Sequence, residues 1–204
     1  MRQIDEIRKL TGGRYLVCLE DGTRFPLYEK ELEEFRIRQN EELSESDFQK
    51  IMEELLPKRA KLKAMHLLKN MDRTEMQLRT RLKNLDYPET VTEEAIAYVK
   101  QYRYIDDLRY ASNYMEYRKE RYSVRQMEQE LLQKGIEKEI IDQALEQTEL
   151  PDEESQIARW LEKKHYSPET ADQKETERMY RFLLRKGYKN SAIQRMMRGK
   201  DLYE

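Results

Sequence analysis

One apolar pattern occurs three times along this sequence. In each copy, leucine or methionine, leucine and a third large apolar residue stand at offsets 0, +4 and +9. The copies are Leu78, Leu82 and Tyr87; Met127, Leu131 and Ile136; and Met179, Leu183 and Tyr188. Their starts are spaced by 49 and 52 residues. Such a fixed period indicates one supersecondary unit copied along the chain. Stacked helical units form extended surfaces rather than deep pockets, which disfavours an enzyme.

The composition agrees with thin helical layers. Charged residues make up 39% of the 204 residues, above the roughly 25% of average globular domains. The net charge of −2 conceals a gradient, because 57–101 and 151–204 are net basic whereas 1–56 and 102–150 are net acidic. This asymmetry permits local contacts with nucleic acid or protein. A dedicated duplex-DNA binder is expected to be more basic overall.

The N-terminal part predicts a small β-meander. Residues 14–19 and 23–28 are β-prone, and Asp21-Gly22 between them is a strong hairpin signal. Gly12-Gly13 marks another turn, with 4–10 as a third strand. Two helices are then expected over 29–38 and 47–56, the second capped by Ser44 or Ser46.

Helix signals divide the rest of the chain into three-helix repeats. The predicted domains are 1–56 for the β-meander with its short helices, then 57–104, 105–150 and 151–204 for the three repeats. In the first repeat, helices are expected over 58–70, from Thr74 to about Leu85, and from Thr90 or Thr92 to about Tyr102. In the second, they are expected from Asp106 or Asp107 to about Arg121, from Ser123 to Gly135, and from Glu137 to about Thr148. In the third, they are expected over 152–165 and 173–186, followed by a short helix capped by Ser191.

The starts and ends of the second helices follow one scheme. Thr74 with Gln77, and Ser123 with Gln126, predict capping boxes. Gly135 and Gly187 are expected to end their helices in a left-handed conformation. Asp86 stands at the same place in the first repeat, and aspartate tolerates that conformation less well.

The second repeat carries a recognisable motif. It reads Tyr-Ile-Asp-Asp-Leu-Arg-Tyr-Ala over 104–111, followed by Arg118 and by Glu-Leu-Leu-Gln-Lys-Gly-Ile over 130–136. This resembles the central signature of the RecX family. The residues that carry it as a structural motif are Asp106, Asp107, Tyr110, Ala111, Leu131, Gly135 and, in the third repeat, Gly187. Leu67-Leu68 and 78–85 match more loosely in the first repeat, as 183–188 do in the third. Residues 14–17 with Asp21-Gly22 resemble the N-terminal extension of Gram-positive members.

The resemblance implies a regulator of the RecA recombinase. Family members are elongated crescents of three tandem three-helix repeats that lodge in the groove of the RecA–single-stranded-DNA filament. They damp its ATPase and strand-exchange activities in homologous recombination, DNA repair and the SOS response, and some also bind single- or double-stranded DNA. We therefore expect a mainly α, non-enzymatic, cytoplasmic monomer that needs no cofactor and no metal.

The candidate chemical groups favour structural roles. Asp106 and Asp107 could form a metal or acid/base pair, but adjacent residues on a helix do not face each other, which favours a helix cap. His66 and His165 have no ligand cluster around them, which disfavours a zinc site or a catalytic dyad. The single cysteine, Cys18, excludes an internal disulfide. No apolar run suits a membrane span, and the first residues lack the apolar stretch of a signal peptide.

Tyrosines gather around the start of the second repeat. Tyr110, Tyr114 and Tyr117 stand at helical spacing, which predicts that they build the core with their hydroxyls at the surface. The alternative is that these rings stack nucleic-acid bases.

Basic residues gather on the second helices and beside their ends. The candidate partner- or DNA-binding residues are Arg79, Arg81 and Lys83; Arg118 and Arg125; and Arg178, Arg181, Arg185, Lys186 and Lys189. A solvated face is one interpretation, and a contact with phosphate or an acidic partner is the other. Arg79, Arg81, Arg118, Arg125, Arg181 and Arg185 are the predicted filament contacts. Two rival functions stay open, a direct helix-turn-helix DNA binder and a generic repeat adaptor for another protein.

Overall fold

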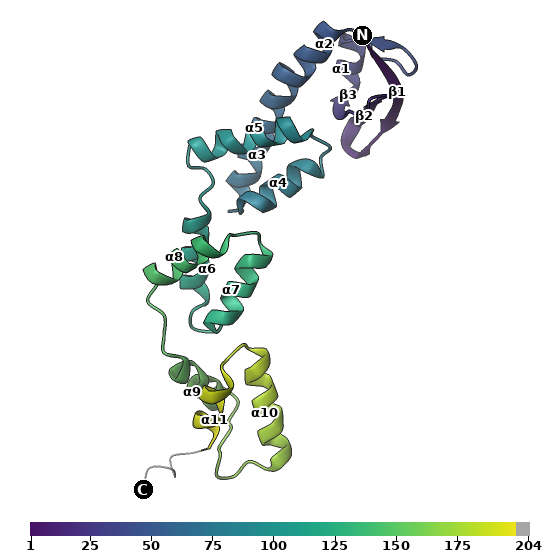
Figure 1. Cartoon of the computed structure of the whole chain (residues 1–204). Coiled ribbons are helices and arrows are strands. Elements are labelled where there is room, and N and C mark those ends of the chain that lie inside the picture. Colours follow the sequence, from purple (N-terminus) through teal and green to yellow (C-terminus); the bar gives the residue numbers. More distant parts are fainter. Residues whose placement is uncertain (199–204) are drawn as a thin grey trace. The chain divides into compact units, whose positions relative to one another are not determined.

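The computed structural model describes residues 1–198, and Figure 1 labels their helices and strands. The chain forms two compact units, Met1–Asp106 and Asp107–Glu204. The first contains the strands and one three-helix repeat, and the second contains two further repeats. The predicted fold class is confirmed, because the protein is mainly α-helical with three three-helix repeats and a small N-terminal β-meander.

The N-terminal sheet is antiparallel and has the strand order β3-β2-β1-β4. Strands β1 (Arg2–Lys9), β2 (Arg14–Leu19) and β3 (Arg24–Tyr28) confirm the three predicted strands. Gly22 in the β2–β3 turn has φ 84°, a conformation that favours glycine. Strand β4 (Glu42–Leu43) is absent from the prediction, because two residues are too short for an alternating pattern.

Helix α1 (Glu29–Glu34) is shorter than the predicted range of 29–38. Arg36 adopts a left-handed φ of 51°, and the Ile37 N–H donates to the Leu32 carbonyl at 2.8 Å. This turn ends the helix and places Ile37 in the hydrophobic core.

The second N-terminal helix begins earlier than predicted. Helix α2 (Glu45–Gln49) is capped by Ser44 rather than Ser46, because the Ser44 hydroxyl accepts from the N–H of Asp47 at 3.0 Å. The cap satisfies one of the unpaired N–H groups at the helix start.

The chain does not leave the helical conformation at the predicted domain boundary. A π-helical stretch (Lys50–Leu55) joins α2 directly to α3 (Leu56–Asn70). Pro57 lies in the first turn of α3 and has no N–H, which interrupts regular α-helical pairing beside the widened π turn. The domain boundaries stay predictions.

Two further helices complete the first repeat, α4 (Glu75–Lys83) and α5 (Glu89–Gln101). The predicted capping box is confirmed, because the N–H of Gln77 donates to Thr74 Oγ1 at 3.2 Å and the N–H of Thr74 donates to Gln77 Oε1 at 3.3 Å. The predicted start of the next helix at Thr90 or Thr92 is wrong. Pro88 occupies the cap position with extended backbone, so the helix starts at once after it.

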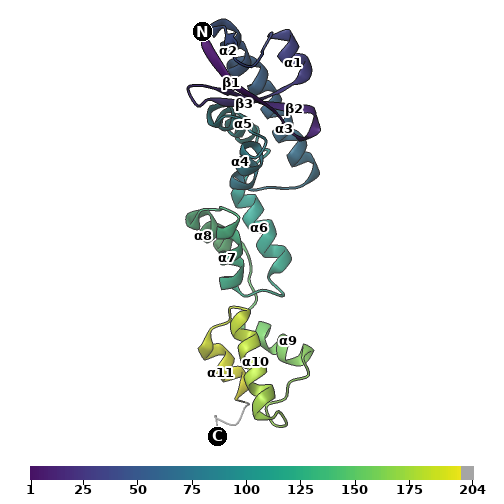
Figure 2. The same cartoon turned by 90° about the vertical axis from the view of Figure 1, so that its right-hand side faces the viewer.

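One hydrophobic core joins the sheet to the first repeat. Phe25 of β3, Leu56 of α3 and Leu78 of α4 are all completely buried within it. The guanidinium of Arg59 on α3 also donates to the Pro26 carbonyl at 3.1 Å. In Figures 1 and 2 the sheet lies beside the run formed by α2 and α3. The sheet is therefore part of the body of the first repeat.

The second unit contains two repeats with separate cores. The second repeat consists of α6 (Asp107–Arg118), α7 (Val124–Gln133) and α8 (Lys138–Gln147). The third consists of α9 (Glu153–Lys163), α10 (Gln173–Arg185) and α11 (Asn190–Met197), which Figure 2 shows as a bundle of their own. Each repeat buries its own apolar cluster.

One predicted capping box and one predicted helix cap in this unit need correction. Ser123 caps α7 by accepting from the N–H of Gln126 at 3.2 Å, but the Gln126 side chain instead donates to Glu130 Oε1 at 3.2 Å and does not close the box. Ser191 does not cap α11, because the helix already starts at Asn190 with Lys189 as its cap residue.

The prediction for the tyrosines is partly wrong. Tyr110 and Tyr114 are half-buried against the second core, as expected. Tyr117 is 86% exposed, whereas Met115 is completely buried. The buried stripe of α6 therefore passes through Ala111 and Met115, which leaves Tyr117 on the outer face.

The threefold apolar pattern has one structural cause, which is how each second helix ends. In each copy of the pattern, the N–H of the third member donates to the carbonyl of the second. The bonds are Tyr87 to Leu82 at 3.4 Å, Ile136 to Leu131 at 3.1 Å and Tyr188 to Leu183 at 3.3 Å. Each bond spans a left-handed residue, with φ of 66° at Asp86, 81° at Gly135 and 83° at Gly187. This is the Schellman motif, in which the two bonded positions also make an apolar contact.

Candidate interaction surface

The motif residues of the second repeat hold the repeat together. Ala111 and Leu131 are completely buried. Asp107 is the first residue of α6, directly after Asp106. The ring of Tyr110 stacks with that of Tyr114, with 6.5 Å between ring centres. Ala111 and Leu131 therefore belong to the core of the second repeat, and the role of Asp106 and Asp107 as a helix cap stays a prediction.

In the first repeat, Arg79 ties two helices together. Its guanidinium contacts Glu75 Oε1 at 2.7 Å on its own helix α4 and Glu93 Oε1 at 2.6 Å on α5. Burial raises the pKa of the Glu75 carboxyl, but the hydrogen bond from Lys100 and the charges of Lys100 and Arg79 outweigh it, so this pKa lies below its ordinary value. Lys83 pairs with Glu89 Oε1 at 2.8 Å.

In the second repeat, Arg118 lies between two aromatic rings. Its guanidinium carbon is 4.8 Å from the ring centre of Tyr114 and 4.7 Å from that of Tyr122. The Tyr114 hydroxyl donates to Glu130, which lies 3.8 Å from Arg118. Burial and this hydrogen bond raise the pKa of Tyr114. Arg118 thus contributes to packing inside the repeat, as a cation over an aromatic face does.

In the third repeat, some basic residues on α10 and directly after it have a partner within the chain, and others have no ion pair within residues 1–198. Arg181 pairs with Glu177 one turn earlier. The Lys186 ammonium lies 5.1 Å from the Trp160 ring centre and 5.2 Å from that of Tyr122. Arg178, Arg185 and Lys189 are exposed at the surface.

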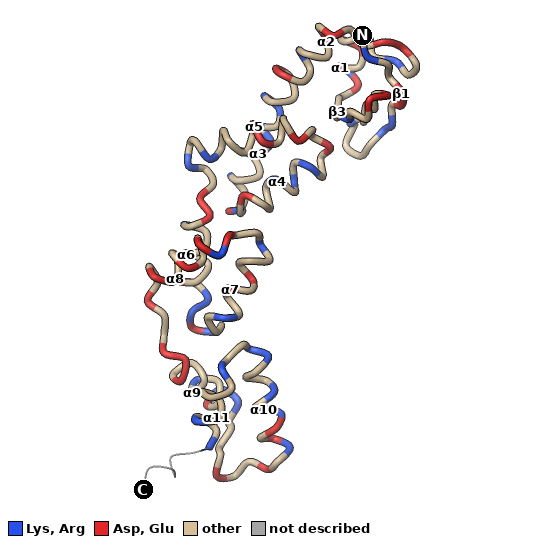
Figure 3. The backbone as a smooth tube through the Cα atoms, viewed as in Figure 1, with Lys and Arg blue, Asp and Glu red and all other residues tan. Residues whose placement is uncertain are grey.

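An outward arginine remains on the second helix of each repeat. Arg81 on α4, Arg125 on α7 and Arg185 on α10 are exposed, and over 1–198 none of these three side chains has an ion-pair partner. Figure 3 shows Lys and Arg positions along these three helices. We define the outer arginine set as Arg81, Arg125 and Arg185. These three are exposed members of the predicted basic surface, one from each repeat, and Arg178 and Lys189 of the third repeat are exposed as well.

Hydrogen bonds join the second repeat to the third, at a contact that we call the joint and that the sequence does not predict. The Ser123 hydroxyl donates to the Lys186 carbonyl at 2.6 Å, while it also caps α7. A Cβ on Gly187 would lie 2.6 Å from Ser123 Oγ, so only glycine leaves room for this contact. The buried Gln156 adds a hydrogen bond to the Lys119 carbonyl at 2.6 Å. Gly187 is the one sequence feature that marks this contact. The left-handed turn at the end of α10 already accounts for a glycine there, so the contact could not be predicted from it.

The remaining candidate groups are dispersed. Both His66 and His165 are exposed, and His66 Nε2 lies 3.4 Å from the amide nitrogen of Asn70. In the described part of the chain, no three His, Cys, Asp or Glu side chains are grouped so as to hold a metal ion. Burial raises the pKa of the Cys18 thiol. Among the helices of residues 1–198, none combines the length and the apolar character needed to cross a membrane.

Comparison with known proteins gives one consistent result. Models of the first, second and third three-helix domains of RecX match residues 60–98, 106–145 and 152–197, respectively. The regulatory protein RecX of Vibrio campbellii is 35% identical over 132 residues, which cover 64% of this chain and 84% of that protein. The regulatory protein RecX of Caldanaerobacter subterraneus subsp. tengcongensis is 27% identical over 193 residues, which cover 94% of this chain and 95% of that protein.

Solved structures agree with the sequence comparison. A crystal structure of regulatory protein RecX has a TM-score of 0.61 and 25% identity to this chain, and the match covers 96% of this chain and 98% of the other. The crystal structure of RecX from Lactobacillus salivarius has a TM-score of 0.58 at 21% identity, which supports the fold.

Proposed function

The chain belongs to the RecX family, and from that premise we propose that it is a non-enzymatic regulator that binds the RecA–single-stranded-DNA filament in the cytoplasm. Relatives that align with nearly the whole chain carry the name regulatory protein RecX, which supports this proposal. The effect we propose is inhibition of the RecA ATPase and of strand exchange. The protein would act as a monomer and without a cofactor.

The observation that carries the proposed contact mode is the outer arginine set. Arg81, Arg125 and Arg185 come from the second helices of three successive repeats and are exposed. A guanidinium pairs bidentately with carboxylate or phosphate, both of which a protein–DNA filament presents. Binding through these charges would be sensitive to salt. Arg79 and Arg118 would act indirectly, by holding the helices that carry the contacts.

The test is the single-strand-dependent ATPase of RecA with this protein added below stoichiometric amounts. We expect the ATPase rate to fall, and we expect the Arg81→Gln, Arg125→Gln and Arg185→Gln triple variant to lose most of this effect. A matched variant replaces three exposed cations elsewhere, Lys30, Lys174 and Arg198, by Gln and should retain it. An unchanged ATPase rate with the wild-type protein would refute the regulatory proposal.

The alternative of a direct helix-turn-helix DNA binder is less well supported by the third helices. Helix α5 exposes Glu93 and Glu94, and α8 exposes Glu139 and Asp142. Carboxylates are a poor match to a phosphate-lined groove. A gel shift of naked duplex DNA at physiological salt would favour this alternative. A pull-down from lysate that recovers no recombinase would favour a generic adaptor.

A further inference from the structure

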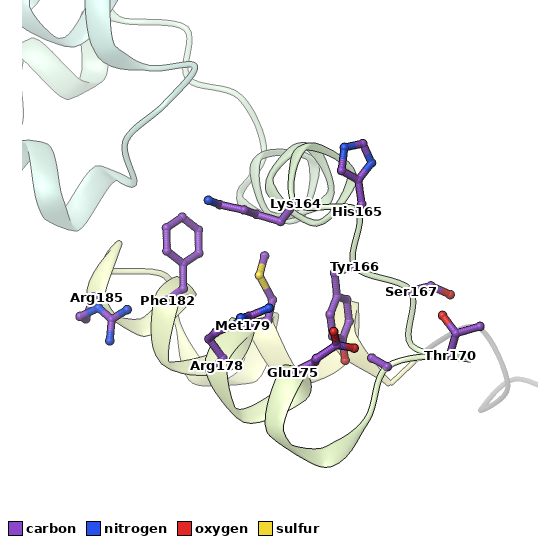
Figure 4. A pocket seen from close by; sticks show the side chains of 11 residues that line it. Lys164, His165, Tyr166, Ser167, Thr170, Glu175, Arg178, Met179, Phe182 and Arg185 are labelled. Atoms are coloured by element: carbon purple, nitrogen blue, oxygen red, sulfur yellow. The ribbon is translucent and has the colours of Figure 1, made fainter.

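The third repeat differs from the other two in one link. Between its first and second helices the chain spans 164–172, whereas the corresponding links span 71–74 and 119–123. Figure 4 shows this longer link running beside α10 and leaving a hollow between them. The hollow has a volume of about 500 Å³. That size lies within the range of roughly 300–1,000 Å³ that is typical of ligand pockets.

The hollow has a positive charge that its own residues do not neutralise. Its lining includes the cations Lys164, Arg178 and Arg185, and among the lining residues that the structure describes Glu175 is the only carboxylate. Within residues 1–198, neither Arg178 nor Arg185 forms an ion pair. Two arginines that form no ion pair, in a lining with one carboxylate, favour an anionic occupant.

The floor of the hollow is apolar. Met179 is 6% exposed, and Phe182 packs edge-on against Trp160 with 5.1 Å between ring centres. Tyr166 comes from the link, and its hydroxyl lies 3.3 Å from Thr176 Oγ1. In Figure 4 the side chains of Met179 and Phe182 rise from α10 toward Lys164, and Tyr166 reaches from the link toward Glu175.

We propose that this hollow binds an acidic peptide segment of a partner protein, with one apolar side chain seated on Met179 and Phe182. The carboxylates that flank this side chain would pair with Arg178 and Arg185. The flexible thioether of Met179 adapts to the shape of an apolar side chain, and the arginine fork matches the geometry of a carboxylate.

The floor favours a peptide over a nucleic-acid base. Base stacking needs a free aromatic face. The Lys164 ammonium lies 5.3 Å from the Phe182 ring centre, and the hydroxyl of Tyr166 is held by Thr176. A base would have to displace Lys164 to stack on Phe182, whereas a smaller apolar side chain can lie on Met179 and on the part of Phe182 that Lys164 leaves uncovered.

The test is fluorescence anisotropy of a short labelled peptide with a Leu-Phe pair flanked by Asp and Glu, added to the full chain. We expect binding, and we expect the double variant Arg178→Gln, Arg185→Gln to weaken it at least about tenfold. The double variant Lys174→Gln, Arg198→Gln removes the same charge from exposed positions outside the hollow. It should change the affinity by less than about twofold.

Changing the peptide keeps the test valid even if a protein variant fails to fold. Replacing its Leu-Phe pair by Ser-Ser should abolish binding to the wild-type chain. Equal weakening by both double variants, or equal binding of the two peptides, would overturn the proposal. So would tighter binding of an oligothymidine that is lost only in the Arg178→Gln, Arg185→Gln variant. The assay contains no recombinase, so its failure leaves the regulatory proposal untouched.

Discussion

The first repeat and the two later repeats use the same helix pattern but are stabilised differently. The first shares one continuous core with the N-terminal sheet, in which Phe25 and Leu78 belong to the same buried cluster. The second and third have small cores of their own, and polar contacts from Ser123 and Gln156 join them. A copied trio of helices thus gains stability from a sheet at one position and from a neighbouring repeat at another. This agrees with the general need of small domains for additional burial.

The largest expected effect comes from the shared core. Phe25→Ala should destabilise the first unit by about 3–5 kcal/mol, because it leaves a cavity at a completely buried position. Hydrogen exchange should accelerate in α4 and α5 although the substitution lies in the sheet. Met127→Ala in the second repeat is the control, and its effect should stay within the second unit. Unchanged hydrogen exchange in α4 and α5 would contradict a core that the sheet and the first repeat share.

The next effect is at the joint of the second unit. Gly187→Ala forces a left-handed alanine, which costs about 1–2 kcal/mol, and overpacking against Ser123 Oγ adds about 1–3 kcal/mol. Urea unfolding followed by the fluorescence of Trp160, the single tryptophan, reports on the third repeat. In a Ser123→Ala background the overpacking should vanish and leave only the backbone cost. Equal costs in the two backgrounds would show that the close approach contributes nothing.

A smaller effect on stability is expected from Ser123→Ala, and it distinguishes the contact between the repeats from the capping of α7. Ser123→Ala should cost about 1–2 kcal/mol for the lost cap and should also remove the hydrogen bond to Lys186. Asp172→Ala removes a cap from α10 whose side chain, within residues 1–198, accepts only from the N–H of Glu175. Hydrogen exchange near Lys186 should accelerate only with Ser123→Ala. If both substitutions act alike there, the Ser123 bond does not connect the repeats.

The smallest expected effect concerns the ion pairs of the first repeat. The pKa of Glu75 is lowered in the folded state, so its ionised form adds stability above the unfolded value of 4.5, and this stability is lost as the pH falls through the folded value. Acidification should therefore destabilise the wild type more than Glu75→Gln, by less than about 1 kcal/mol because the pair is partly exposed. A carbon-detected NMR titration giving an ordinary or raised pKa would contradict this.

Much of the fold could be predicted because it depends on local chemistry. Only a few residues close in sequence determine the Schellman motifs at Asp86, Gly135 and Gly187 and the cap at Thr74. The joint is not determined in this way, because Ser123 and Lys186 lie 63 residues apart and meet only after two repeats have folded. The spacing of the tyrosines wrongly predicts that Tyr117 is buried, because Met115 on the same helix offers an equally good apolar spacing and takes the core position.

The basic surface shows the same limit. Charge clustering identified Arg79 and Arg118 together with Arg81 and Arg125, since sequence spacing cannot tell a paired cation from an outward one. Arg79 meets Glu93 on the next helix, and Arg118 meets the ring of Tyr122 across a turn. The hollow of the third repeat had only a longer link as its signal.

The most direct test of the account is the affinity of the chain for a RecA–single-stranded-DNA filament at two salt concentrations. The wild type should bind more weakly at the higher salt concentration, and the Arg81→Gln, Arg125→Gln, Arg185→Gln variant should bind weakly at both, with a smaller salt dependence. The matched Lys30→Gln, Lys174→Gln, Arg198→Gln variant should resemble the wild type. Identical affinity and salt dependence of the two triple variants would contradict a contact through the outer arginine set.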